Sequence, residues 1–158
     1  EGMVSGFTTV TTSTQHTAFT GSKTNVAVVS SALELSGAQT GSYAFSAAVD
    51  LTTVATRRFE ADIAATSFST TDLIDSRTDL IDDWGPMDGG VINDCDVTLY
   101  AAITDDDPAG SPTWSAWMPF FVADFTSRAA KFKLDFVSGD ATHNISVSTL
   151  AVDIKVPT

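Results

Sequence analysis

The sequence predicts an all-β fold, an antiparallel β-sandwich of the jelly-roll or galactose-binding type with long acidic loops and little helix. Several segments alternate apolar and polar residues with a period of two, which is typical of half-buried strands. Stretches rich in Gly, Pro and Asp separate these segments. No segment has a convincing amphipathic helical pattern, so strands joined by turns are the expected architecture.

The first third of the chain predicts a weakly patterned start followed by two strands. Residues 1–25 are rich in Thr and Ser and predict an extended lead-in or an edge strand. Residues 26–158 are expected to form a single sandwich domain. Its first apolar segments, Val26–Leu35 and Ser42–Val49, predict an early pair of strands.

Four later segments alternate clearly, and each predicts a strand with one apolar face. Residues 67–94 and 104–112 interrupt them with Asp-, Gly- and Pro-rich turns. The inward-facing residues are expected to be Arg57, Phe59, Ala61 and Ile63; Cys95, Val97, Leu99, Ala101 and Ile103; Ala130, Phe132, Leu134 and Phe136; and Leu150, Val152, Ile154 and Val156.

The charge of the chain limits its partners. Twenty acidic residues against eight basic ones give a formal net charge of −12 and a pI near 4.1. Such a surface repels phosphate backbones, so no nucleic acid partner is expected. No apolar run approaches the roughly 18 residues of a membrane span, and Glu1 begins no signal-peptide pattern. The single cysteine, Cys95, excludes an internal disulfide framework.

Three segments carry a family resemblance. They are DSRTDLIDDW (Asp75–Trp84), the long stretch Asp94–Phe136 that contains TDDDPAGSPTW and WMPF, and the closing STLAVDIKVPT (Ser148–Thr158). In this order they resemble the C-terminal β-sandwich of tailed-phage tail proteins of the host-specificity or tail-fibre type. The similarity extends over roughly residues 42–158.

The resemblance implies a non-catalytic structural and attachment module in the virion, at the phage tail and extracellular when mature. The implied partners are other tail subunits, in a homo-oligomer that is a trimer or a hexamer, and a host-surface glycan or protein. A free-standing carbohydrate-binding module with a loop site is the alternative function, and a tail-associated glycan hydrolase is the third. No catalytic residue is expected, because nothing in the sequence pairs two carboxylates and no nucleophile motif is present.

The predicted contact residues are Trp84, Tyr100, Trp114, Trp117 and Arg128. Aromatic rings give a flat apolar platform for a sugar, although packing in the core is their commoner role. Because Trp114 and Trp117 are three residues apart, they cannot face the same side of a regular strand, so one is expected in the core and the other near the surface. For Arg128 the alternatives are an ion pair with a nearby aspartate and a ligand contact.

The acidic loops offer the only predicted cofactor site, for a structural calcium ion. Asp105, Asp106 and Asp107 supply the hard oxygen ligands that calcium prefers, but their spacing matches no EF-hand. Solvated loop carboxylates are the simpler interpretation, and no other cofactor is expected.

Overall fold

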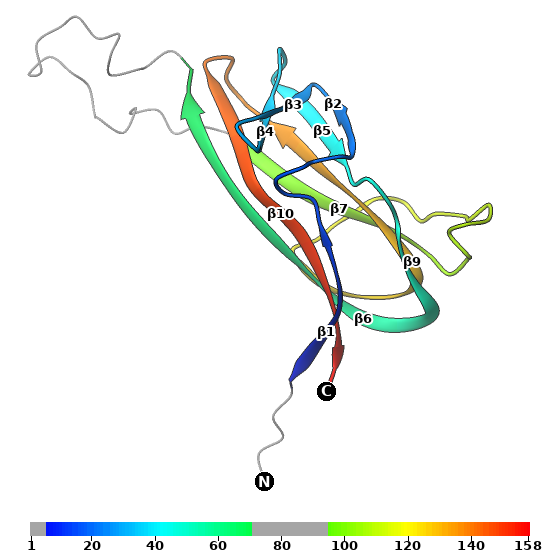
Figure 1. The fold of residues 1–158 in the computed structure, drawn as a ribbon. Coiled ribbons are helices and arrows are strands. Elements are labelled where there is room, and N and C mark those ends of the chain that lie inside the picture. Colours follow the sequence, from blue (N-terminus) through cyan, green and yellow to red (C-terminus); the bar gives the residue numbers. More distant parts are fainter. Residues whose placement is uncertain (1–5, 71–94) are drawn as a thin grey trace, which may run out of the picture.

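The structure is a computed structural model, and it describes residues 6–70 and 95–158. These residues form ten antiparallel strands and no helix (Figure 1), which confirms the predicted all-β antiparallel sandwich. The strands are β1 (Phe7–Thr14), β2 (Ser22–Thr24), β3 (Val26–Val29), β4 (Ala32–Leu35), β5 (Thr40–Ala44), β6 (Val49–Ser69), β7 (Asp96–Thr104), β8 (Met118–Pro119), β9 (Val122–Val137) and β10 (His143–Pro157).

Two long strands, β6 and β9, join the layers of the sandwich. The first part of β6 pairs with the first part of β9, from Val49↔Ala130 to Glu60↔Val122. From Arg58 to Ser69, the other edge of β6 pairs with β10, which also pairs with β4 and β1. The second part of β9 lies between β5 and β7 instead. The sheet therefore folds back on itself and nearly closes into a barrel-like shape.

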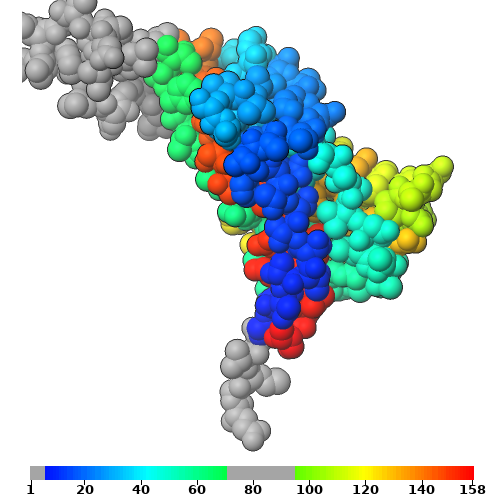
Figure 2. Space-filling model, in the orientation of Figure 1, coloured from blue at the N-terminus to red at the C-terminus, as the bar shows by residue number. Residues whose placement is uncertain are grey.

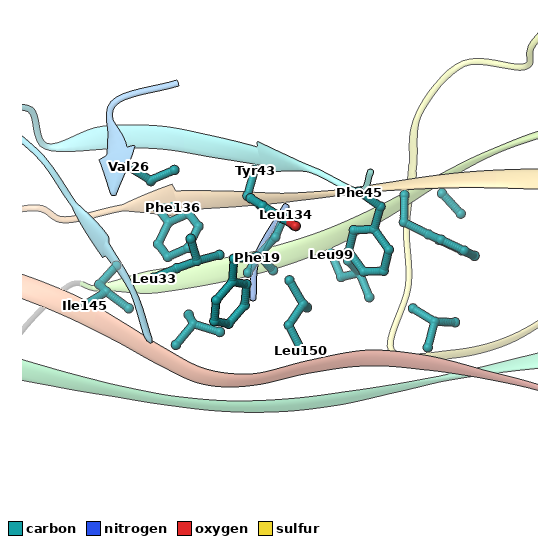
Figure 3. Close-up of a cluster of buried hydrophobic side chains, with 14 of the residues drawn as sticks. Phe19, Val26, Leu33, Tyr43, Phe45, Leu99, Leu134, Phe136, Ile145 and Leu150 are labelled. Carbon is teal, nitrogen blue, oxygen red and sulfur yellow. The ribbon is translucent and has the colours of Figure 1, made fainter. Parts of the chain in front are cut away.

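The hydrophobic core lies between these layers, and most of its side chains come from the predicted alternating segments. Figure 3 shows Leu99, Leu134 and Phe136 from β7 and β9 facing Ile145 and Leu150 from β10. The predicted inward residues of β6, β7 and β9 all belong to the core cluster or pack against it, apart from Arg57. Three of the four inward residues predicted for the last strand, Leu150, Val152 and Ile154, are also fully buried.

The predicted early pair of strands is wrong in two respects. Val26–Leu35 is not one strand but a hairpin, because Ser30 and Ser31 form a two-residue turn between β3 and β4. Both serines have positive φ, 49° and 65°, as a type I′ turn requires. The second predicted strand, Ser42–Val49, is also divided, since β5 ends at Ala44 and β6 begins at Val49. The two segments do not pair with each other: β4 pairs with β10 and β5 with β9.

The Thr-rich start contributes both an edge strand and a core side chain. β1 pairs along β10 over residues 7–14, as Figure 2 also shows by the contact of the blue and red surfaces. The turn after β1 then places Phe19 in the core, edge-on to Tyr43 at 5.8 Å between ring centroids. The Tyr43 hydroxyl donates to Gln15 Oε1 (2.7 Å) and accepts from the Gly21 backbone N–H (2.8 Å).

Among the predicted inward positions, Arg57 alone carries a charge, and backbone carbonyls accept most of its hydrogen bonds. Between Asp50 and Ala55 the β6–β9 register shifts, so β6 has extra residues there relative to β9. The Arg57 guanidinium donates to the carbonyls of Thr53 (3.1 Å) and Ser127 (3.2 Å) across this bulge. Arg57 thus supplies hydrogen-bond donors to carbonyls of both strands where the ladder between them is interrupted.

Among residues 6–70 and 95–158, no helix is long and apolar enough to cross a membrane.

Candidate functional site

The candidate site lies on the outer face of β7 and β9. In the register of these strands Tyr100 is opposite Lys133, and Ala102 is opposite Lys131. Their neighbours along each strand, such as Leu99 and Phe132, point into the core. Alternation therefore places Tyr100 and both lysines together on the surface of the sandwich.

An irregular segment brings two tryptophans onto the same face. After β7 the chain forms a loop that projects from the sandwich and then returns (Figure 1). Ser115 fixes the returning segment along β7, because its N–H donates to the Ile103 carbonyl (2.9 Å) and its hydroxyl accepts from the Ile103 N–H (3.0 Å). The short strand β8 continues this pairing, with Met118 opposite Ala101.

The tryptophans, the tyrosine and the lysines form an alternating row, which we call the Lys–aromatic face (Tyr100, Trp114, Trp117, Lys131 and Lys133). The Lys131 ammonium lies 4.8 Å from the Trp114 ring centroid and 5.2 Å from that of Trp117. The Lys133 ammonium lies 5.1 Å from Trp117 and 5.2 Å from Tyr100. All four distances are within the range of cation–π attraction, so each ring is held by at least one lysine.

The expectation that one tryptophan is in the core is wrong. Trp117 is 37% exposed, Trp114 is half-buried, and neither belongs to the core cluster. The strand rule did not apply because residues 111–117 are irregular and strand pairing resumes only at Met118. Three of the predicted contact residues, Tyr100, Trp114 and Trp117, are thus brought together on one surface.

Beside Trp114 lies a shallow depression of about 390 Å³, which we call the acidic depression. Its polar lining comes from the loop carboxylates Asp105 and Asp106 and from several hydroxyl groups, and Trp114 forms part of its wall. The hydroxyl-bearing residues are Thr104, Thr113, Ser115 and Thr126. A ring beside several hydrogen-bonding groups is the combination that sugar sites use.

Arg128 contacts two carboxylates, and its guanidinium lies over none of the three rings of the Lys–aromatic face. Its guanidinium Nε lies 3.3 Å from Asp50 Oδ1, and its Nη2 lies 3.1 Å from Asp107 Oδ2. The ion pair with a nearby aspartate is therefore present, and its partners lie outside the 67–94 segment. The pKa of Asp50 is lowered, first by the hydrogen bond from the Thr52 backbone N–H and then by Arg128.

The three predicted calcium ligands have separate environments. Asp107 contacts Arg128, and Asp106 Oδ2 accepts from the Thr113 backbone N–H at 2.9 Å. Asp105 is exposed. Within the described part of the chain, no cluster of three or more His, Cys, Asp or Glu side chains could hold a metal ion. The calcium site remains a prediction, and so does the role of Trp84, which lies outside the described residues.

The only described histidine with a hydroxyl and a carboxylate beside it does not form a catalytic triad. His143 Nδ1 lies 3.1 Å from Thr142 Oγ1 and 3.4 Å from Asp140 Oδ2. A triad needs the nucleophile and the carboxylate on opposite ring nitrogens, whereas here both approach the same one. Of these three residues, His143 lines a cleft of about 430 Å³, whose wall also includes Leu35, Gln39 and Asn144.

Sequence reasoning missed Lys131 and Lys133 as members of the site. The signal was present, because their alternation with Phe132 and Leu134 already placed both on an outward face. What was missing was the register that sets Tyr100 opposite Lys133.

Comparisons of the chain with protein-family models, with curated proteins and with solved structures found no match.

Proposed function

We propose that this chain is a non-catalytic attachment module that binds its partner through the Lys–aromatic face. The observation that carries the proposal is that Tyr100, Trp114 and Trp117 lie together on the outer surface and outside the core. Aromatic rings are costly to leave in water, and contiguous exposed rings are typical of contact surfaces.

The proposed setting is the tail of a bacteriophage, and its support is the resemblance of residues 42–158 to tail-protein sandwiches. In that setting the module packs with other tail subunits and contacts the host surface. One described feature agrees with an attachment module: the binding residues lie on paired strands β7 and β9 and on one adjoining loop, where binding residues are commonly placed.

The alternative function, a carbohydrate-binding module, uses the same surface. The acidic depression favours it, because carboxylates and hydroxyls beside Trp114 can accept and donate hydrogen bonds to sugar hydroxyls. The two functions differ in setting: the tail module packs with other tail subunits and binds a host-surface glycan or protein, whereas the free-standing module binds a glycan alone.

The test is a glycan array and a host-cell binding assay with the intact chain and two variants. Trp117→Ala should abolish saturable binding, since it removes the central ring of the face. Phe121→Ala is the matched control. Phe121 has the most exposed large apolar side chain of the described residues (65%), and the substitution keeps its backbone carbonyl, which accepts a hydrogen bond from the Ala61 N–H of β6. Equal binding by both variants and the unchanged chain would refute attachment through this face. Release of sugar products from host polysaccharide would refute the non-catalytic role.

A further inference from the structure

Lys131 is exceptional among the basic residues of this acidic chain. Of the eight basic residues, Arg77 lies outside the described part. Within the described part, every lysine and arginine except Lys131 has an oxygen atom as hydrogen-bond or ion-pair partner. The partners are the Gly21 carbonyl for Lys23, backbone carbonyls for Arg57, Asp124 for Arg58, Asp50 and Asp107 for Arg128, Asp135 for Lys133, and Glu60 for Lys155.

No described residue accepts a hydrogen bond from the Lys131 ammonium. Its ammonium is placed between the rings of Trp114 and Trp117, at 4.8 and 5.2 Å from their centroids. The rings attract the charge but accept none of the three N–H bonds in the way an oxygen does. An anionic oxygen is the strongest acceptor that a ligand can bring to such a group.

The second lysine of the face presents its charge nearby. Lys133 lies two residues along the same strand, so its ammonium emerges on the same side. Its ion pair with Asp135 is long, 3.6 Å, and both side chains are partly exposed, so this pair contributes little and can be replaced. Two cations and three rings on one surface match a ligand with both negative charges and flat apolar faces.

We propose that the Lys–aromatic face binds an acidic polysaccharide, with carboxylates on Lys131 and Lys133 and sugar rings against Trp117. This inference rests on the proposed attachment function and names its ligand class. At physiological salt the screening length is about 8 Å, so distant acids weaken this binding little. The nearby acids are Asp135, whose long ion pair with Lys133 a ligand carboxylate would replace, and the two of the acidic depression, Asp105 and Asp106. The wall of that depression includes Trp114 but not Lys131. Duplex DNA, with a charge every 1.7 Å or so, meets more repulsion from the net charge of −12 than a polymer with one carboxylate per sugar.

The experiment measures binding by isothermal titration calorimetry with a panel of uronic-acid oligosaccharides, such as oligogalacturonate and alginate oligomers. Each is compared with its methyl ester, which keeps the sugar rings and removes the charge. At least one acidic oligomer should bind saturably, and its ester should bind at least about tenfold more weakly, as expected for loss of a charge-assisted hydrogen bond.

The variants separate a local role of Lys131 from a general effect of charge. Lys131→Met keeps an unbranched stem against the tryptophans and should weaken binding of the acidic oligomer at least about tenfold. Lys131→Arg keeps the charge and the cation–π contacts and should retain binding. Lys155→Met changes the net charge equally but lies on β10, where Lys155 pairs with Glu60, and should leave binding unchanged.

Several results would overturn the inference. Absence of saturable binding to every acidic oligomer at millimolar concentration would do so, as would unchanged binding by Lys131→Met. Equal binding of polyglutamate would show that sugar rings are not recognised, and tighter binding of a single-stranded oligonucleotide would point to nucleic acid. If esters bind as well as acids and Trp117→Ala still abolishes binding, the acidic ligand is wrong but attachment through the face stands.

Discussion

The hydroxyl of Tyr43 offers a sharp test of how the start of the chain is joined to the core. Tyr43 is fully buried, and its hydroxyl connects Gln15 Oε1 at 2.7 Å to the Gly21 N–H at 2.8 Å. In Tyr43→Phe, Gln15 Oε1 keeps a bond from the Ser46 N–H (3.2 Å), but the Gly21 N–H loses its acceptor.

The free-energy cost of Tyr43→Phe can be estimated from the Gly21 N–H, which is left without an acceptor. A buried donor without an acceptor costs roughly 1–3 kcal/mol, and because Gly21 is only partly buried we expect a loss of about 1 kcal/mol in the free energy of unfolding. For a domain of this size, that corresponds to a fall of about 2–4 °C in melting temperature. Urea denaturation and a thermal melt followed by circular dichroism measure both quantities.

The same substitution elsewhere provides the control. Tyr100→Phe also removes one hydroxyl, but that hydroxyl lies on the outer face and makes no hydrogen bond to a described residue. Its melting temperature should stay within about 1 °C of the original, as for surface changes in general. If Tyr43→Phe melted at the same temperature as Tyr100→Phe, the hydroxyl would not join Gln15 and Gly21 to the core as described.

Three further predictions concern a turn, the pH dependence and a metal. Replacing Ser30-Ser31 with Asn-Gly, the residues that type I′ turns prefer, should raise stability by about 1 kcal/mol in urea denaturation; no gain would contradict the turn type. Because the pKa of Asp50 is lowered, its ionised side chain stabilises the fold at pH above the ordinary Asp pKa of about 4. This stabilisation is lost as the pH falls through the folded-state pKa. Asp50→Asn should therefore flatten the acid limb of a melting-temperature profile, whereas Asp105→Asn, whose side chain has no bond to the described residues, should not. Addition of EGTA should leave the melting temperature unchanged, because Asp106 and Asp107 are already engaged; a reproducible fall would indicate bound calcium.

Much of the fold could be predicted because three long strands have a core face on one side only. Phe59, Leu99 and Phe132 each lie in a period-two pattern, and each is buried as predicted. Burial of one face is what produces that pattern, so the sequence reports it directly. The hairpin at Ser30-Ser31 was missed because serine is not a usual residue for positive φ, and the turn therefore has no local signature.

The site was predictable only in its parts. Tyr100, Trp114 and Trp117 were each identified as contact residues, but the sequence contains no relation between them. Their meeting depends on the β7–β9 register and on the path of residues 111–117, which are set by long-range pairing. Arg128 illustrates the same limit, because its partners Asp50 and Asp107 are far from it in sequence.

The central place of β10 also determines when this protein can fold. β10 supplies a partner to β1, β4 and β6, yet it follows all three of them in the sequence. During synthesis these three strands emerge before the strand that covers their edges, and unpaired edges are sites of aggregation. The pairing of Phe7 with Pro157 joins residues that are very distant in sequence, and such non-local pairing slows folding. Yield on expression should therefore depend on chaperones and on protein concentration more than on the stability of the finished sandwich.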